Sequence, residues 1–293
     1  RGEYFQSSGG LRGMFGVAGM EWARMSGSYG RRVRYGLFLL PAVAAIALTD
    51  HDTLAGVSEA AAVGESVGVR VVSGCEFSVK SWWGELHLLG YFLPADHPEL
   101  NRFLVTQRDG RVKRAEEIVR RLSNLGVRVS MESVRRHAAG GSIGRPHVAR
   151  ALVDAAKVAS VNQAFDRYLS DDGPAYVPKP LPELEAVTSL VSRLGGVTSA
   201  AHLKERATLS TLSRLRQGGV DAVEVLHPSH DNGTVSRLRA WSADLEMLKS
   251  GGSDWHGDHG SPDDRRTIGA LRVPGEWLEA LERLHRERVG SES

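Results

Sequence analysis

An apolar stretch in the first third of the chain ends in acidic and histidine residues. Residues Ala42–Leu48 are continuously apolar, and Thr49–Asp52, with the sequence Thr-Asp-His-Asp, follow them directly. A continuous apolar run of this length is typical of a buried parallel strand, and α/β folds place their chemistry at the carboxyl ends of such strands. A helical stretch at Ser58–Val67 and a second short strand at Val69–Ser73 come next. This order predicts that Glu76, after the second strand, lies beside the histidine that ends the first.

Six histidines fall at or near the ends of expected strands, together with four carboxylates. Such a mixed set of imidazole and carboxylate groups suits Zn, Mn or Fe better than an all-oxygen Ca or Mg site. The groups outnumber the ligands of one tetrahedral zinc ion, which favours a cluster of two or three ions that activates a water and clamps both oxygens of a displacement at phosphorus. A lone histidine at a strand end is more often structural, so the hypothesis depends on the combination. The groups are His51, His87, His202, His227, His230 and His256, with Asp50, Asp52, Glu76 and Asp254.

The composition is that of an ordinary globular protein. Of the 293 residues, 41% are hydrophobic and 25% are charged, so the length permits one large α/β domain or one domain with an insertion. The formal net charge of +2 does not favour binding of bulk nucleic acid, so any phosphate recognition must be local. The single cysteine, Cys75, excludes an internal disulfide framework and suits a reducing cytoplasm as a buried, inert thiol. The apolar stretch Tyr35–Leu48 is too short to span a bilayer, and we expect a soluble, cytoplasmic protein.

Four segments differ in character along the chain. Residues 1–41 are punctuated by glycine, have no clear period and are expected to be poorly ordered, whereas residues 42–98 and 179–293 alternate short apolar strands with helical stretches. Residues 99–178 are expected to be mostly helical and to form an inserted cap. The first helix of this insertion carries a basic polar face, for which a solvated surface is the favoured interpretation over contact with phosphate. That face consists of Arg108, Arg111, Lys113, Arg114, Arg120 and Arg121.

The α/β segments predict a definite series of further elements. Asp254 and His256 follow a Gly-Gly-Ser turn, and their i, i+2 spacing on an extended segment points both side chains the same way. We expect strands at Glu85–Phe92, Val197–Ala201 and Ala222–Leu226, and helices at Pro182–Leu194, Thr208–Gln217, Thr234–Ala243 and Pro274–Arg288.

Seven motifs, in order, resemble those of PHP-domain metal-dependent phosphoesterases. The resemblance is strongest to the branch of bacterial nucleoside 3′,5′-bisphosphate phosphatases and 5′→3′ exoribonucleases, and it extends from Ala42 to Gly269, including the helical insertion. It implies an α/β fold, a distorted (β/α)7 barrel of the PHP type with an inserted helical cap domain. The motifs are Ala45–Gly56 (AIALTDHDTLAG), Gly74–Ser78 (GCEFS), Glu85–Phe92 (ELHLLGYF), Gly144–His147 (GRPH), Ala200–His202 (AAH), Glu224–His230 (EVLHPSH) and Gly252–Gly257 (GSDWHG).

The resemblance also implies roles for individual residues. It implies two or three divalent metal ions, with manganese expected and zinc or iron as alternatives. The expected partner is a small phosphorylated nucleotide or a 5′-phosphorylated oligonucleotide, with no membrane and no obligate protein partner. The metal ligands would be His51, Glu76, His87, His202, Asp254 and His256. The groups facing the substrate phosphates would be Arg145, His147, His227 and His230, and the candidate catalytic groups are His227, His230, Asp50 and Asp52.

The amino terminus departs from the family pattern. Members of this family open with a strand bearing Asp-Leu-His-x-His and then a Ser-Asp-Gly turn, which supply two histidine ligands and one aspartate. Residues 1–41 contain no histidine. Either this segment is a mis-joined sequence, which its abrupt change of composition favours, or the chain is a variant that has lost part of its metal site. In both cases we expect weakened metal binding and low activity.

Hydrolysis of nucleotide phosphate esters is therefore the predicted function. Arg145 would hold a phosphate through a forked contact, and His227 or His230 would orient the ester or protonate the leaving oxygen. The alternative is a non-catalytic PHP-like module that binds a nucleotide or a protein partner, and chelator-insensitive binding would distinguish it. A barrel amidohydrolase is disfavoured, because no lysine stands at an expected strand end to bridge metals as a carbamate.

Overall fold

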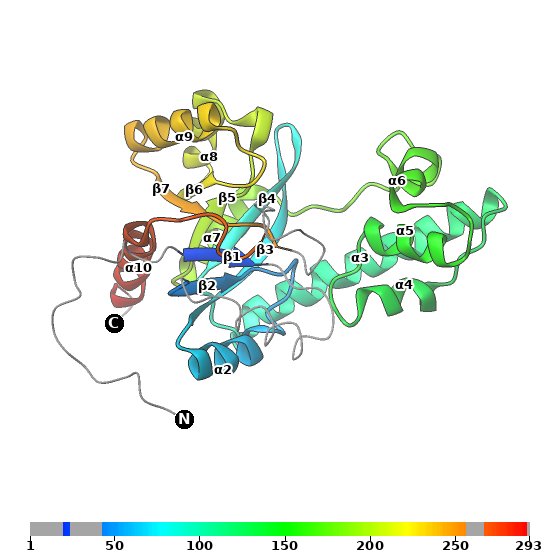
Figure 1. The fold of residues 1–293 in the computed structure, drawn as a ribbon, viewed down its shortest axis with the longest axis horizontal. Helices are drawn as coiled ribbons and strands as arrows, with labels where there is room; N and C mark the ends of the chain where they lie inside the picture. Colours follow the sequence, from blue (N-terminus) through cyan, green and yellow to red (C-terminus); the bar gives the residue numbers. More distant parts are fainter. Residues whose placement is uncertain (1–19, 24–42, 256–266, 292–293) are drawn as a thin grey trace.

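A curled sheet of seven strands forms the centre of the fold (Figure 1). The computed structural model describes residues 20–23, 43–255 and 267–291. The strands lie side by side in the order of the chain. They are β1 (Met20–Ala23), β2 (Ala45–Leu48), β3 (Arg70–Ser81), β4 (Gly84–Tyr91), β5 (Val197–Ala200), β6 (Ala222–Leu226) and β7 (Leu248–Gly251).

Helices surround this sheet, and their inner faces form one hydrophobic core with it (Figure 1). Apart from the second strand, the predicted α/β elements occur within a few residues of their expected bounds. None of the helices in the described ranges is both long and apolar enough to cross a membrane. The surrounding helices are α2 (Val57–Val67), α7 (Leu184–Arg193), η2 (Lys204–Arg206), α8 (Leu209–Gln217), α9 (Asn232–Asp244) and α10 (Gly275–Gly290).

The sheet is mixed rather than fully parallel. Strands β3 and β4 pair antiparallel, as do β4 and β5, whereas the other neighbours pair in parallel. Only Trp82 and Trp83 separate β3 from β4, and a crossover to a parallel strand needs a dozen or more residues, so the chain must turn back on itself. The regular alternation of strand and helix in a (β/α)7 barrel is interrupted at this hairpin.

Strand β3 is longer than the sequence predicted. The expected end at Ser73 is wrong, because the strand continues to Ser81 and pairs with β4 in an unbroken ladder. The hydrogen bonds of this hairpin stabilise the extension. Glu76 therefore lies within a strand and not after one.

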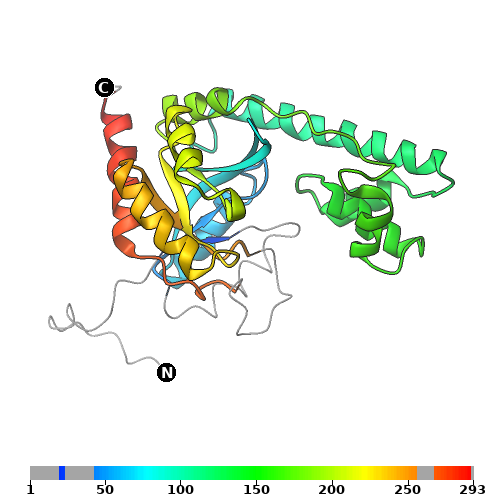
Figure 2. The same ribbon diagram turned by 90° about the horizontal axis from the view of Figure 1, so that it is seen from above.

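The helical insertion forms a second body beside the sheet. The 27-residue helix α3 (Pro98–Asn124) begins at the sheet and extends along the insertion, and the shorter helices pack under its far end (Figure 2). This body is mostly helical, as predicted, and has a hydrophobic cluster of its own. Its other helices are α4 (Met131–Ala138), α5 (Arg145–Asp154), α6 (Val161–Ala164) and the π-helical η1 (Phe165–Leu169).

One strand comes from the segment in which no element was expected. Within residues 1–41, β1 pairs in parallel with β2, with Met20 opposite Ala45 and Ala23 opposite Leu48. The structure describes only these four residues of the segment, and poor order of residues 1–41 stays a prediction.

Candidate active site

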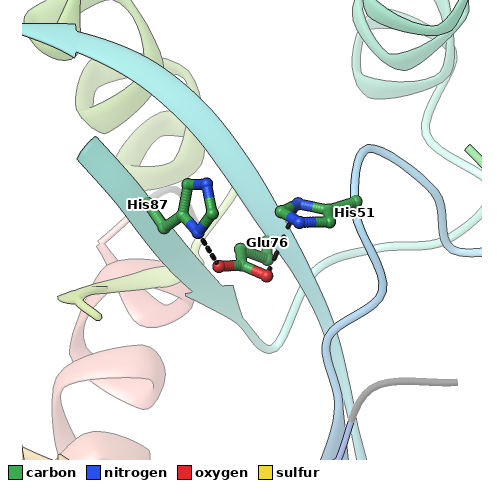
Figure 3. Close-up of side chains that lie close together, drawn as sticks. All are labelled: His51, Glu76 and His87. Atoms are coloured by element: carbon green, nitrogen blue, oxygen red, sulfur yellow. Dashed lines mark ion pairs between the residues drawn. The ribbon is translucent and has the colours of Figure 1, made fainter. Parts of the chain in front are cut away.

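Two histidines and a glutamate meet at one edge of the sheet (Figure 3). His51 follows β2, Glu76 lies in β3 and His87 in β4. The Nδ1 atoms of His51 and His87 lie 3.4 and 2.7 Å from the two carboxylate oxygens of Glu76. One ligand atom from each residue lies within 4.8 Å of the other two. Two imidazoles and a buried carboxylate at these separations fit a divalent transition metal ion.

Backbone pairing brings these three residues together. An isolated parallel bridge joins His51 to Glu76, and the amide of Glu76 donates to the carbonyl of Asp50 over 3.1 Å. Across the hairpin, His87 stands opposite Ser78, two residues from Glu76 and on the same face. The prediction that Glu76 lies beside His51 is confirmed.

Three more histidines continue from His87 in a row of ring contacts. The ring of His202 is centred 5.0 Å from that of His87, and its Nε2 lies 3.5 Å from Glu76 Oε1. His227 and His230 follow, with ring centroids separated by 5.4 Å from His202 to His227 and 5.5 Å from His227 to His230. The expectation that strand ends bring the histidines together is met for the five in the described residues, and His256 lies outside those residues.

His227 faces an acidic residue that was also expected at the site. Its Nδ1 accepts a hydrogen bond from the Ser229 amide over 3.1 Å, which places the proton of a neutral ring on Nε2. That Nε2 lies 3.6 Å from Asp254 Oδ2. His227 thus lies beside the carboxylate of Asp254, with its Nε2 just beyond hydrogen-bonding distance.

His230 uses both ring nitrogens on backbone groups. Its Nδ1 lies 3.1 Å from the Val225 carbonyl, and its Nε2 accepts the Lys204 amide over 3.3 Å. Burial lowers the pKa of His230 to about 4. The predicted catalytic and phosphate-binding roles do not match this arrangement, in which His230 supports the loop around its neighbour.

The two aspartates after β2 occupy different environments. Asp50 lines a cavity with His51, whereas the carboxylate of Asp52 forms a buried ion pair with Arg111 Nε. Asp52 is 2% exposed and Arg111 is 7% exposed. The predicted catalytic role is not supported for Asp52, because its carboxylate holds α3 against the sheet.

A cavity of about 360 Å³ joins the metal-ligand candidates to the helical body. One wall holds His51 and His87, and the other is strongly cationic. Cations held in a partly enclosed space attract a phosphate group more strongly than cations in bulk water. The cationic residues that line it are Arg111, Arg114, Arg145, Arg150 and Lys179.

Arg145 lies in this cavity in a fixed orientation. Its Nη1 donates to the Leu169 carbonyl over 2.9 Å and to Asp171 Oδ1 over 2.6 Å. Its guanidinium also lies 5.8 Å from the ring centre of Phe165 and 5.3 Å from that of Tyr176. The partners fix the plane of the guanidinium, which is what a forked contact to phosphate requires.

His147 lines the same cavity and also supports the backbone. Its Nδ1 accepts a hydrogen bond from the Gly144 amide over 3.0 Å at the start of α5. Burial, and then the nearby charge of Arg150, lower the pKa of His147 to about 4. The ring is therefore neutral at neutral pH.

Four of the five cavity cations were missed or misinterpreted from the sequence. The basic face of α3 was interpreted as solvated, and this is wrong for Arg111 and Arg114, which line the cavity. A signal was present, because Arg111 falls in the apolar stripe of α3 between Leu104 and Ile118, at a spacing of seven residues on each side. The other two, Arg150 and Lys179, were not singled out, and Lys179 lies in an irregular segment that carries no periodic signal.

Lys179 lies between the cavity and the β3–β4 hairpin. Its Nζ donates to Glu85 Oε1 over 2.8 Å and to Ser78 Oγ. Burial, and then the charge of Arg111, lower the pKa of Lys179 to about 8, so the amine is still charged at neutral pH. Burial opposes ionisation of Glu85, but its hydrogen bonds to His87 and Lys179 outweigh it and lower the pKa of Glu85.

Comparison with known proteins agrees with this geometry, although no family model matches the chain. A 5′-3′ exoribonuclease of Haemophilus influenzae is 30% identical over 217 residues, which cover 72% of this chain and 78% of that protein. A 3′,5′-nucleoside bisphosphate phosphatase of Chromobacterium violaceum is 30% identical over 227 residues, covering 73% and 78%. A solved structure from Bifidobacterium adolescentis, described as a metal-dependent phosphoesterase, matches with a TM-score of 0.80 at 25% identity, covering 92% of this chain and 96% of that one.

The fold, the histidine and carboxylate row and these similarities define the class of protein as a metal-dependent phosphoesterase. The chain belongs to the PHP family of these enzymes, in the branch that contains the two relatives named above. The resemblance found in the sequence motifs is confirmed, as is the prediction of a phosphoric ester hydrolase.

Proposed function

We propose that the chain hydrolyses phosphate esters of nucleotides, either nucleoside 3′,5′-bisphosphates or 5′-phosphorylated oligonucleotides. One observation carries the proposal: a single cavity joins His51 and His87, the two histidines beside Glu76, to five cationic side chains. The names of the two relatives support a nucleotide or RNA substrate.

The metal site would be built from the row of histidines and its carboxylates. Two or three divalent ions are proposed, with manganese preferred over zinc and iron. When bound, such ions polarise phosphoryl oxygens and lower the pKa of a coordinated water. The ligands would be His51, Glu76, His87, His202 and Asp254, with His256 from outside the described residues.

The substrate phosphates would lie against the cationic wall. Arg145 is held for a forked contact, and Arg114 and Lys179 add charge nearby. Phe165 lines the same cavity and offers a ring on which a base can stack. His227 would orient the ester through a hydrogen bond from Nε2 to a substrate oxygen, because its Nδ1 is occupied by the Ser229 amide.

The domain organisation that follows is a PHP barrel with a helical cap. Residues 42–98 and 179–293 would form the two parts of a distorted (β/α)7 barrel, and residues 99–178 the cap. The separate hydrophobic clusters of the sheet and the helical body support this division. The single buried cysteine supports a reducing, cytoplasmic location.

The test is release of phosphate or nucleotide from adenosine 3′,5′-bisphosphate and from a 5′-phosphorylated RNA oligomer, with Mn²⁺ added or removed by chelator. We expect chelator-sensitive hydrolysis of at least one substrate, lowered by the absence of a His-x-His motif in residues 1–41. Restoring that motif should raise the rate. Nucleotide binding that chelator does not affect, without turnover by either protein, would support the non-catalytic module instead.

A further inference from the structure

A series of polar contacts links the metal-ligand candidate His87 to the segment by which the chain returns from the helical body. His87 Nε2 lies 3.2 Å from Glu85 Oε1, and Lys179 Nζ donates to the same oxygen over 2.8 Å. Lys179 belongs to the irregular segment 170–183, which joins η1 to α7. The contacts therefore connect strand β4 with a part of the chain about ninety residues away.

The two ring nitrogens of His87 face different carboxylates. Nδ1 lies 2.7 Å from Glu76 Oε1, within the candidate metal site, while Nε2 faces Glu85. A histidine that binds metal through one nitrogen usually donates the other N–H to a carboxylate, which sets the tautomer and the orientation of the ring. Glu85 occupies that position for His87.

Glu85 itself needs a partner to hold its side chain in place. It lies one residue from the turn of the hairpin, and its side chain is 35% exposed. A carboxylate in that position has several rotamers open to it, each with water as a partner. The ammonium of Lys179, whose side chain is only 9% exposed, selects one of them.

Lys179 is in turn fixed from two directions. The Ser78 hydroxyl that it contacts also lies 3.3 Å from Arg111 Nη2, so this hydroxyl joins α3 to the same network. The segment is anchored on β3 as well, because the Lys80 amide donates to the Pro182 carbonyl over 2.8 Å. The position of the ammonium is thus set by the sheet and by α3 before any ligand binds.

We propose that Lys179 is a positioning residue for the metal site, which fixes the imidazole of His87 through Glu85. The position of segment 170–183 on the sheet is thereby coupled to metal binding. The proposal rests on the proposed function, which places a metal ion at His87. Because coupling between two sites is reciprocal, metal binding should order the segment, and loss of the lysine contact should weaken metal binding.

Substitution of Lys179 by methionine tests the first half of this coupling. Methionine keeps an unbranched side chain, one atom shorter than that of lysine, and removes the ammonium. We expect the affinity for Mn²⁺, measured by titration calorimetry, to fall by about 10-fold or more, the range found when such outer partners of ligands are removed. The absorption spectrum of bound Co²⁺ should change, since it reports ligand geometry, and Lys179→Arg should restore both properties in part. The matched control is Lys157→Met, an exposed lysine of the helical body, which should bind as the unaltered protein does.

Hydrogen exchange of residues 170–183 tests the second half. Mn²⁺ should slow exchange in this segment in the unaltered protein and not in the Lys179→Met variant. If Lys179→Met does not fold, Glu85→Gln replaces it: the amide still accepts a bond from His87 but loses the attraction to Lys179, and we expect a smaller loss of affinity.

The outcomes separate this inference from the proposed function. If the unaltered protein binds neither Mn²⁺ nor Co²⁺, the proposed metal site fails. If it binds them, and the folded Lys179→Met or Glu85→Gln variant matches it in affinity and Co²⁺ spectrum, the metal site stands and the positioning role is overturned.

Discussion

The two walls of the cavity are built by different means. On the sheet side, His51, Glu76 and His87 take their places from strand pairing, which is formed by backbone groups. On the helical side, Arg111 and Arg145 are placed by particular partners, a buried carboxylate for one and a carbonyl and an aspartate for the other. Both walls contribute to the same cavity.

Because of this difference, the two walls should respond differently to substitution. Backbone pairing is formed whatever side chain a strand position carries, so replacing one sheet-side ligand leaves its neighbours in place. A cation on the helical side depends on its partner, and removal of that partner releases it or leaves it buried without a counter-charge. Sheet-side substitutions should therefore affect chemistry without affecting the fold, and helical-side substitutions should affect both.

The largest effect is expected for Glu76→Gln on the sheet side. The amide has the size of the carboxylate but no charge, so the affinity for metal should fall steeply. Activity should drop by at least about 100-fold, which exceeds the loss seen when a residue that only orients a ligand is removed. The unfolding midpoint of the metal-free protein should change little. Glu65→Gln on the exposed face of α2 is the control, and metal binding and hydrolysis are the measurements. Full Mn²⁺ binding by Glu76→Gln would remove this residue from the site.

Asp52→Asn provides the contrast on the helical side. The change leaves Arg111 buried without a counter-charge, and breaking such a pair lowers the free energy of unfolding by about 3–5 kcal/mol. The double variant with Arg111→Met should recover much of that loss, because both charges are then gone. Urea unfolding of the metal-free proteins measures these free energies. A small loss for the single variant, like that of Asp109→Asn on the exposed face of α3, would mean that the pair does not fix this wall.

Much of the sheet side could be predicted because its signals are local. The apolar run before Asp50 specified β2, and the later apolar runs specified β5 and β6 nearly to the residue. Histidines at the ends of such runs converge because a curled sheet brings neighbouring strand ends together. The length of β3 was missed, since its second half is stabilised by a partner strand and not by its own pattern.

The helical side was harder to predict because its signals come from tertiary contacts. Arg111 stands in the apolar stripe of α3, but an arginine there identifies a buried ion pair only once Asp52 is known to face it. Lys179 has no periodic context, and its place follows from contacts with β3 and β4. The occupied nitrogens of His230 likewise depend on a backbone path that the sequence does not specify.

Arg145→Lys tests whether the fixed guanidinium recognises phosphate. Lysine keeps the charge but cannot form a forked contact, so one charge-assisted hydrogen bond is lost, about 1.5–3 kcal/mol. We expect kcat/KM to fall by about 10–100-fold, mainly through KM, with metal binding unchanged. The control is Arg167→Lys, an exposed arginine on η1. Unchanged kinetics for Arg145→Lys would leave phosphate recognition to the other cavity cations.

The smallest expected effect concerns the acid stability of the helical wall. The pKa of His147 is lowered to about 4 in the folded protein, against about 6.5 in an unfolded chain, because the ring is buried and close to Arg150. Between these values the unfolded state binds a proton that the folded state does not. The contribution of His147 to stability is therefore complete above about pH 6.5 and is lost as the pH falls toward 4.

His147→Asn removes this titration while its side-chain oxygen can still accept the Gly144 amide at the start of α5. Urea unfolding at several pH values measures the free energy of unfolding of the unaltered protein and of the His147→Asn variant. As the pH falls from 6.5 to 4, the unaltered protein should lose roughly 1–3 kcal/mol of stability relative to the variant, because the variant lacks the acid-sensitive group. A constant difference across that range would show that the ring titrates as it does in water. The helical wall would then be more open to solvent than its contacts indicate, and the contrast with the sheet side would be sharper still.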